Sequence, residues 1–361
     1  MLAMRWRALG LVACLSIACR RTPAPEPPSP PRAVPSTTPV ARAIDSVLVG
    51  VRARVSLAAP EWQLQPLAFG QHLFGVLGAE GVRTYGLPAL TLLVDEPLVA
   101  PSGIVALAGG SLLASGRAGA LRLDPGAKKA VRLPPIPSLP GTLLLPERRD
   151  SGFVWAAQTR SQLLLRQRLE LDPTRSFDRS ITLEDYDGGP LTILRDGALF
   201  YRAPGGVRRC LPESRPRPLA TSFPAWRLLP GRRVDQAWAI AADGSVELWL
   251  VGERLLVQKR FAAGAAPYDA AANSEYLALV VIDEPGNAPR RFRLLVFTND
   301  GERLVERELA PGPPEVGDDW EARAVENRQI ALGEGDPFVA VGGPGSVALF
   351  RLPAGTPVPL P

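Results

Sequence analysis

The sequence predicts an all-β protein whose main body is a single β-propeller of about seven four-stranded blades. Proline and glycine occur throughout, with 39 and 34 copies in 361 residues, and this frequency is incompatible with long helices. Short apolar runs lie between them and recur with a period near 40 to 45 residues. Such a period with several short strands per unit is typical of a β-propeller.

The individual strands are indicated by apolar or alternating runs bounded by turn residues. Val246–Val251 and Leu277–Ile282 are two such runs, and Asp243-Gly244 and Asn299-Asp300-Gly301 are turn sequences. Turns of this composition between apolar runs indicate β-hairpins. Two β-sandwiches would explain the strands but not their period.

Seven blocks of this kind follow one another. They open at Leu73, Leu112, Phe153, Ala198, Ala237, Leu277 and Phe338, with spacings of 39, 41, 45, 39, 40 and 61 residues. Because a propeller must close into a ring, the last block needs an outer strand from elsewhere. We expect the strand-like segment Val47–Leu57 to supply it, so that blades bury each other's faces around the axis.

One stretch resembles a WD-repeat blade. Ala241–Trp249 contains an Asp-Gly hairpin that leads into a strand ending in Trp249. Leu113–Asp124 matches the same pattern less closely. The Gly-His pair that opens WD repeats is absent, since His72 is the sole histidine. The resemblance implies propeller architecture and leaves the subfamily open.

The first eighteen residues are predicted to form an export signal. Arg5 and Arg7 precede an apolar stretch, Ala8–Ala18, that is too short for a permanent membrane-spanning helix. The end of this stretch, Leu15–Cys19, resembles the lipobox of bacterial lipoproteins. That resemblance implies acylation of Cys19, palmitate being one such acyl group. Cys14 is the alternative acylation site, and a plain signal peptide or membrane anchor is a further alternative.

A proline-rich segment follows the acylatable cysteine. We therefore expect a signal peptide at 1–18, a lipidated cysteine with a linker at 19–43, and the propeller at 44–361. Proline-dense chain favours a semi-rigid extended tether of about 3.1 Å per residue. Arg20 follows the cysteine in place of the Asp that retains enteric lipoproteins in the inner membrane. By that resemblance the cell envelope, and its outer rather than its inner membrane, is the expected location.

Composition restricts the partners of the chain. Lys and Arg exceed Asp and Glu by 41 to 36, but Glu147–Arg233 alone holds sixteen Arg against ten acids. We find no basic stripe interleaved with aromatic residues, so nucleic acid is not an expected partner. No run after the leader approaches 18 apolar residues, so we expect no membrane-spanning helix there. We also expect a monomer, and we expect no cofactor.

Residues that could carry chemistry are few. Asp269 and Glu326 lie near predicted innermost strands and are the candidate catalytic carboxylates of an alternative function, a propeller hydrolase or lyase acting in the central channel. Asp185 and Asp187 form half of a calcium-loop pattern and are a weak metal candidate; otherwise we expect no metal. Cys210 is expected to be a structural cysteine.

The longest spacing contains the residues favoured for partner binding. The gap of 61 residues before Phe338 holds a proline-rich insert with Asp318, Asp319 and Trp320. Inserted loops are frequent binding sites, and Trp is enriched at interfaces. The sequence thus predicts a lipid-anchored envelope scaffold without catalysis, which binds proteins or envelope components through a propeller rim and the membrane through its N-terminal lipid.

Overall fold

The computed structural model describes most of the region after residue 41. The chain divides into two compact units, Met1–Thr37 and Thr38–Pro361, and every described residue belongs to the second unit. The described residues are 42–47, 67–78, 81–99, 101–107, 109–116, 119–133, 142–146, 153–158, 162–168, 177–187, 189–211, 214–283, 291–309, 329–334, 337–343 and 346–352. Among them no helix is long and apolar enough to cross a membrane.

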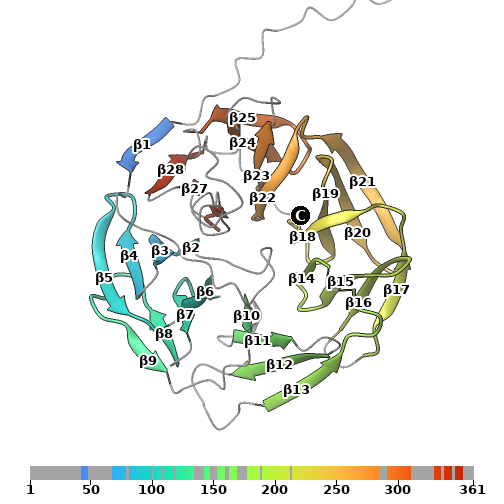
Figure 1. The fold of residues 1–361 in the computed structure, drawn as a ribbon, viewed down its shortest axis with the longest axis horizontal. Helices are drawn as coiled ribbons and strands as arrows, with labels where there is room; N and C mark the ends of the chain where they lie inside the picture. Colours follow the sequence, from blue (N-terminus) through green and yellow to red (C-terminus); the bar gives the residue numbers. More distant parts are fainter. Residues whose placement is uncertain are drawn as a thin grey trace, which may run out of the picture. The chain divides into compact units, whose positions relative to one another are not determined.

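The described part of the second unit contains seven four-stranded antiparallel sheets, as the sequence predicts. We number the blades along the chain (Figure 1). Blades 1 to 3 contain β2 (Leu67–Gly70), β3 (Leu73–Leu77), β4 (Gly81–Gly86) and β5 (Thr91–Pro97); β6 (Pro101–Ala106), β7 (Leu112–Gly116), β8 (Gly119–Leu123) and β9 (Val131–Leu133); and β10 (Thr142–Pro146), β11 (Phe153–Gln158), β12 (Gln162–Arg168) and β13 (Phe177–Thr182).

The remaining four blades follow the same plan. They contain β14 (Leu191–Ile193), β15 (Leu199–Ala203), β16 (Gly206–Cys210) and β17 (Arg217–Ala220); β18 (Ala225–Pro230), β19 (Gln236–Ala241), β20 (Ser245–Val251) and β21 (Leu255–Ala262); β22 (Ala266–Ala272), β23 (Tyr276–Asp283), β24 (Arg291–Thr298) and β25 (Arg303–Glu308); and β26 (Ile330–Leu332), β27 (Phe338–Gly343) and β28 (Ser346–Arg351), with β1 (Arg42–Val47) as the fourth strand of blade 7.

The ring of blades is closed by β1, the first strand among the described residues. β1 pairs antiparallel with β28, with Arg42 opposite Arg351 and Val47 opposite Ala348. The prediction that an N-terminal strand completes the last blade is confirmed. The predicted position is wrong by five residues, because the strand is Arg42–Val47 and was expected at Val47–Leu57. Each innermost strand contacts the next around the ring, from β2 to β26 and back to β2.

The sequence repeat corresponds to the second strand of each blade. The predicted block starts Leu73, Leu112, Phe153 and Phe338 are the first residues of β3, β7, β11 and β27, and the other three lie within one residue of a second-strand boundary. The second strand carries the clearest apolar signal because it lies inside the sheet and is covered on both faces. β19, for example, is buried along its whole length.

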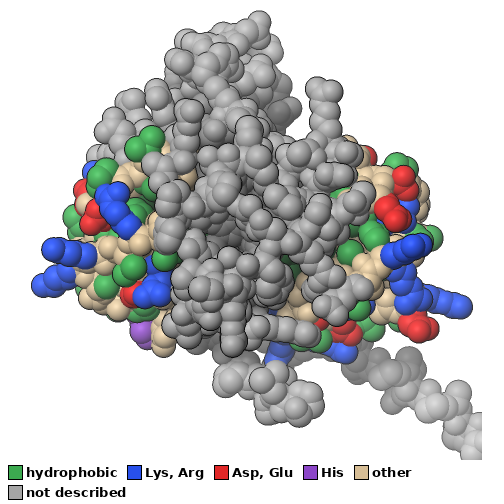
Figure 2. Space-filling view, turned by 90° about the horizontal axis from the view of Figure 1, so that it is seen from below, with side chains coloured by type: hydrophobic (Ala, Val, Ile, Leu, Met, Phe, Trp, Pro, Cys, Tyr) green, Lys and Arg blue, Asp and Glu red, His purple; other side chains and the backbone are tan. Residues whose placement is uncertain are grey.

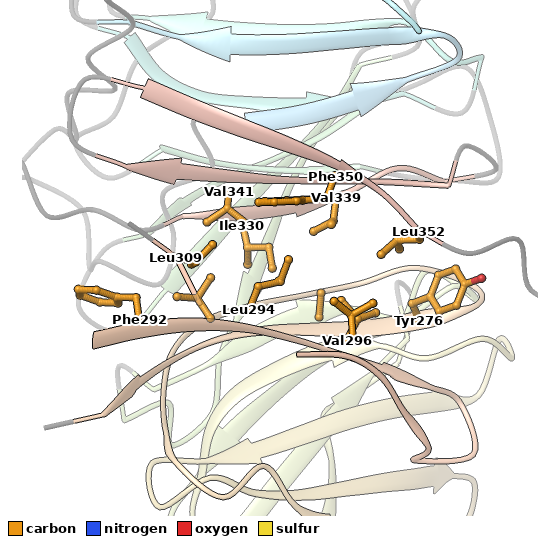
Figure 3. Packing of buried hydrophobic residues seen from close by; sticks show 13 residues of the cluster. Tyr276, Phe292, Leu294, Val296, Leu309, Ile330, Val339, Val341, Phe350 and Leu352 are labelled. Carbon is orange, nitrogen blue, oxygen red and sulfur yellow. The ribbon is translucent and has the colours of Figure 1, made fainter. Parts of the chain in front are cut away.

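Apolar cores lie between neighbouring blades. Between blades 6 and 7, Leu294 and Val296 of β24 face Val339 and Val341 of β27 (Figure 3). All four side chains are at most 3% exposed. A blade therefore buries its faces against its neighbours, and burial on this scale contributes about 25 cal/mol per Å² of apolar surface.

The stretch that resembles a WD repeat forms the hairpin between β19 and β20. Gly244 has φ of +84°, its N–H donates to the Ala241 carbonyl at 3.1 Å, and the Asp243 carboxylate accepts from the Ser245 N–H at 2.8 Å. The hydrogen bonds from Ser245 hold the pKa of the exposed Asp243 below its usual range. Further along β20, Trp249 donates its indole N–H to buried Glu247 at 2.6 Å.

Candidate functional site

The innermost strands enclose a central cavity of about 190 Å³. Six blades supply its described lining, and blades 1 and 2 contribute only apolar side chains to it. The lining residues are Leu67, Ala68, Phe69, Val105, Ala106, Thr192, Ile193, Leu194, Arg227, Leu229, Pro230, Asp269, Ala270, Ala271, Ala272, Gln329, Ile330, Ala331, Leu332 and Glu334. The polar groups of this lining all come from blades 4 to 7, and we call this side of the lining, which also carries apolar residues such as Ile330, the polar wall.

A buried ion pair joins three blades on the polar wall. Arg227 of β18 lies 3.2 Å from Asp269 of β22, and the second Asp269 oxygen accepts from the Ile330 N–H of β26 at 2.9 Å. The Ala270 N–H donates to the first oxygen at 2.8 Å. Burial raises the pKa of the Asp269 carboxyl, although Arg227 and the two N–H groups act in the opposite direction. Both carboxylate oxygens are therefore engaged in the fold.

Two other polar side chains belong to this wall, Gln329 just before β26 and Thr192 of β14, which are 9% and 7% exposed. The Gln329 Oε1 is buried without a hydrogen-bond partner among the described residues. A buried polar group that is left unpaired costs about 1–3 kcal/mol.

A second ion pair crosses one mouth of the cavity. In each blade the turn between the first and second strands and the turn between the third and fourth strands lie at the same end, because consecutive strands are antiparallel. We call this end the first rim and the other end the second rim. On the first rim, Arg195 of blade 4 pairs with Glu334 of blade 7 at 2.8 Å and donates to the Gly231 carbonyl at 2.6 Å.

The first rim of blades 4 and 5 exposes arginines beside apolar residues. We call Leu211, Arg215, Arg217, Arg232, Val234 and Arg254 the blade 4–5 patch. Leu211 and Val234 are 41% and 58% exposed. The four arginines take part in no ion pair in the described part of the chain. Figure 2 shows Lys and Arg side chains, interspersed with acidic ones, standing out from both flanks of the described surface.

Hydrogen bonds connect the two blades beneath this patch. Arg217 lies opposite Arg209 in the sheet, and Arg209 pairs with Asp196 in the neighbouring turn. The adjacent Arg195 reaches the Gly231 carbonyl of blade 5, next to Arg232. These contacts tie the β14–β15 turn of blade 4 to the β18–β19 turn of blade 5.

Several predicted site residues lie outside the described residues. These are Cys14, Cys19, Asp318, Asp319, Trp320 and Glu326. The insert that holds four of them connects β25 to β26. Asp269 is described, and the structure places it in the cavity wall on the innermost strand β22.

The two calcium-candidate carboxylates each pair with an arginine. Asp185 pairs with Arg208, and Asp187 lies 2.9 Å from Arg202 and also accepts from the Gly189 N–H. Within the described residues, no group of three or more His, Cys, Asp or Glu side chains could hold a metal ion.

The histidine and the third cysteine have clear positions. His72 lies in the turn between β2 and β3 on the first rim, with φ of 53°, and its carbonyl accepts from the Leu87 N–H at 2.9 Å. Cys210 ends β16, is buried, and its Sγ lies 3.3 Å from the Ser214 carbonyl oxygen.

The residues that surround Asp269 are not apparent as its partners from the sequence alone. Arg227 and Gln329 are single polar residues that precede or interrupt apolar runs, and nothing local marks them as inward-facing. A partial signal existed, because alternation along β18 places Arg227 on the same side as Leu229, but an irregularity between Ala225 and Arg227 interrupts this alternation. The blade 4–5 patch was visible only as an excess of arginine.

Comparison with known proteins supports the fold. No protein family and no curated protein matches the sequence. Solved structures do match. The β-propeller domain of Cps50 (Swd1) from Myceliophteria thermophila is 14% identical, with a TM-score of 0.55 over 86% of this chain and 99% of that chain.

Two further structures agree with this result. A chain of a mitotic checkpoint complex is 11% identical, with a TM-score of 0.57 over 94% of this chain and 99% of that chain. Hsv2 of Kluyveromyces lactis is 13% identical, with a TM-score of 0.51 over 80% and 94%. At these identities the similarity shows architecture alone: the described residues between Arg42 and Leu352 form a WD40-like β-propeller.

Proposed function

We propose that this chain is a lipid-anchored envelope scaffold that binds a protein partner through the first rim of its propeller. The blade 4–5 patch is the observation that carries the proposal. It combines the exposed side chains of Leu211 and Val234 with four arginines that form no ion pair with other described residues. Arg is enriched in protein interfaces, and apolar residues within a polar surround are typical of the buried part of an interface.

The patch favours an acidic partner surface. Positive charge on one rim speeds the encounter with negatively charged proteins, and the apolar pair then loses its contact with water. Glu253 is the one exposed carboxylate beside the patch that forms no ion pair in the described part of the chain. The similar propeller in the mitotic checkpoint complex belongs to a protein assembly, which supports a binding role by analogy.

The membrane anchor belongs to the same proposal. Acylation of Cys19 would hold the chain at a membrane, and the segment up to Arg42 would separate the propeller from the lipid surface. The absence of an acidic residue after Cys19 supports the outer membrane. Tethering to the membrane would raise the effective concentration of the propeller near partners in the same envelope.

The insert around Trp320 is a second candidate for the binding surface. It joins β25 to β26, whose ends at this connection lie at the second rim, opposite to the blade 4–5 patch. Alanine at Asp318, Asp319 and Trp320 should abolish partner binding if the insert is the site. An Arg→Glu series in the patch should abolish it if the first rim is the site.

Crosslinking and pull-down from the native envelope test the proposal. We expect Arg215→Glu, Arg217→Glu and Arg254→Glu together to remove the captured partner while the melting temperature stays within a few degrees. Lys128→Glu and Lys129→Glu form the matched control, because both lysines are exposed on the first rim of blade 2. Equal partner recovery from both variants would refute a role of the patch.

A hydrolase or lyase is the alternative function. Asp269 lies in the central cavity, as that alternative requires, but its oxygens are held by Arg227, Ala270 and Ile330. A general base needs a free lone pair directed at substrate. Turnover by purified protein that is lost in Asp269→Ala or Glu326→Ala would establish the enzyme and overturn the scaffold.

A further inference from the structure

We propose that the first rim docks against the first rim of a second copy of this chain, with the blade 4–5 patch of each copy facing three carboxylates of blade 6 in the other. The inference goes beyond the proposed function, because it concerns pairing of identical chains and not capture of an envelope partner. It departs from the monomer that we expected from the sequence. Neighbouring sectors of opposite charge on the described part of the rim carry it.

Blade 6 presents three carboxylates on the first rim. Glu275 lies in the β22–β23 turn, and Asp300 and Glu302 lie in the β24–β25 turn. All three residues are exposed, and none forms an ion pair within the described part of the chain. We call Glu275, Asp300 and Glu302 the blade 6 acids.

Hydrogen bonds hold the two turns that carry these acids. The Asn299 side-chain amide donates to the Ser274 carbonyl at 2.7 Å, which joins one turn to the other. The Asn273 side-chain oxygen accepts from the Glu275 N–H at 2.8 Å, and the Asn273 amide donates to the Gly333 carbonyl of blade 7 at 2.6 Å. The backbone beneath the acids is therefore ordered before a partner arrives, which lowers the entropic cost of docking.

The basic and acidic sectors are neighbours on one rim. Blades 5 and 6 follow one another in the ring, and their innermost strands β18 and β22 are in contact. The four arginines of the blade 4–5 patch form no ion pair with the blade 6 acids or with any other described residue. Both sets of charges are thus available to a partner. A uniformly acidic surface would be attracted by the patch and repelled by blade 6.

A second copy supplies charges in the matching order. When two first rims face each other across a twofold axis along the boundary between blades 5 and 6, blade 5 of each copy faces blade 6 of the other. Arginines then oppose carboxylates, and each contact occurs twice, as in any isologous dimer. Exposed ion pairs contribute little individually. The pairing is therefore weak in dilute solution and is favoured where copies are concentrated, as a common membrane anchor would do.

Co-purification of two differently tagged full-length chains from one cell envelope tests the pairing. The patch variant combines Arg215→Glu, Arg217→Glu and Arg254→Glu. The acid variant combines Glu275→Lys, Asp300→Lys and Glu302→Lys. We expect each variant to capture a second copy of itself at least about tenfold less than wild type does, because like charges then face each other. Wild-type capture should also weaken severalfold between about 0.1 M and about 1 M NaCl, as the screening length falls from about 10 Å to about 3 Å.

The decisive measurement mixes the two variants. In a mixed pair the reversed patch faces the reversed acids, and the two unreversed sets face each other, so every contact regains opposite charges. Co-expression should therefore restore capture to within about twofold of wild type. An acidic protein that bridged two copies would give no restoration, because the patch variant would still repel it. No self-capture by the wild-type chain, wild-type capture by either variant, or loss without restoration would each refute the pairing.

Control variants carry the same charge changes elsewhere. Glu184→Lys with Glu308→Lys is the control for the acid variant, since both carboxylates are exposed on the second rim and form no ion pair with described residues. Lys128→Glu with Lys129→Glu is the control for the patch variant. Both controls should pair normally, and every variant should melt within a few degrees of wild type.

The acid variant separates this inference from the proposed function. It keeps the blade 4–5 patch intact, so it should lose self-capture and still recover the envelope partner. The pairing fails if mixing restores nothing, whatever the partner does. The partner-binding role fails if the patch variant and its control recover equal amounts of partner, whatever the second copy does.

Discussion

Arg195 and Glu334 form an ion pair of 2.8 Å across one mouth of the propeller although 139 residues separate them in the chain. Their turns belong to blades 4 and 7, which are not neighbours in the ring. Arg195 is 13% exposed and Glu334 is 40% exposed, so water screens the pair on one side. The pair links distant blades without passing through the ones between them.

A double-mutant cycle measures this link. Arg195→Gln and Glu334→Gln should show a coupling free energy of unfolding of about 0.5–1 kcal/mol, the upper part of the range for partly exposed pairs. Arg195→Gln should cost more than Glu334→Gln, since it also removes the bond to the Gly231 carbonyl. Urea unfolding of the four proteins provides the values, and zero coupling would show that the pair contributes nothing to ring stability.

Closure of the ring by β1 predicts an asymmetric truncation profile. Removal of residues 1–41 should leave cooperative unfolding intact, because β1 starts at Arg42. Removal of residues 1–47 exposes the edge of β28, and removal of the block from Phe338 exposes two blade faces. We expect the shorter truncation to be soluble and the last to be insoluble. A well-folded protein lacking Phe338–Pro361 would contradict a single cooperative ring.

The hairpin that resembles a WD repeat depends on Gly244. A Cβ there would lie 2.3 Å from the Ala265 carbonyl oxygen, and φ is +84°. Gly264→Ala is the matched control, because Gly264 has φ of +80° and a Cβ at that position would meet no described atom within 4 Å. The control should lose about 1–2 kcal/mol from its left-handed backbone. Gly244→Ala should lose more, and equal losses in thermal unfolding would rule out the steric contribution.

The raised pKa of Asp269 sets the sign of a pH dependence. The folded protein binds the Asp269 proton more tightly than the unfolded chain does, so this group stabilises the fold less as pH rises from about 3.9 through the raised pKa. Asp269→Asn keeps the uncharged form at every pH. The melting temperature of wild type minus that of the variant should therefore fall over this window and then stay constant. A difference that rises with pH would mean that the ion pair with Arg227 outweighs burial.

Acylation of Cys19 is tested by metabolic labelling. Cells given radioactive palmitate should label the wild-type chain and fail to label Cys19→Ala. Cys14→Ala serves as the control and should label normally. Label that persists in Cys19→Ala would reassign the acylated residue.

The blades could be predicted from the sequence, but the residues that line the cavity could not. Second strands such as β19 have both faces covered, and their apolar runs gave the repeat directly. First strands such as β14 and β26 span three residues each, and successive residues of β26 pack toward different neighbours, Ile330 toward blade 6 and Ala331 toward blade 1. So short a segment gives little periodic signal. Arg227 and Gln329 therefore read as ordinary surface residues until the ring brings them together with Asp269.

The position of β1 has a mechanical consequence. Every force exerted on the chain before Arg42 enters the propeller through the strand that also seals the ring, and passes to β28 through the hydrogen bonds between these two strands. The β1–β28 pair therefore both receives this force and closes the ring. A propeller pulled from its N-terminal side would open first between these two strands, and blades 1 to 6 would stay intact while blade 7 lost its outer strand.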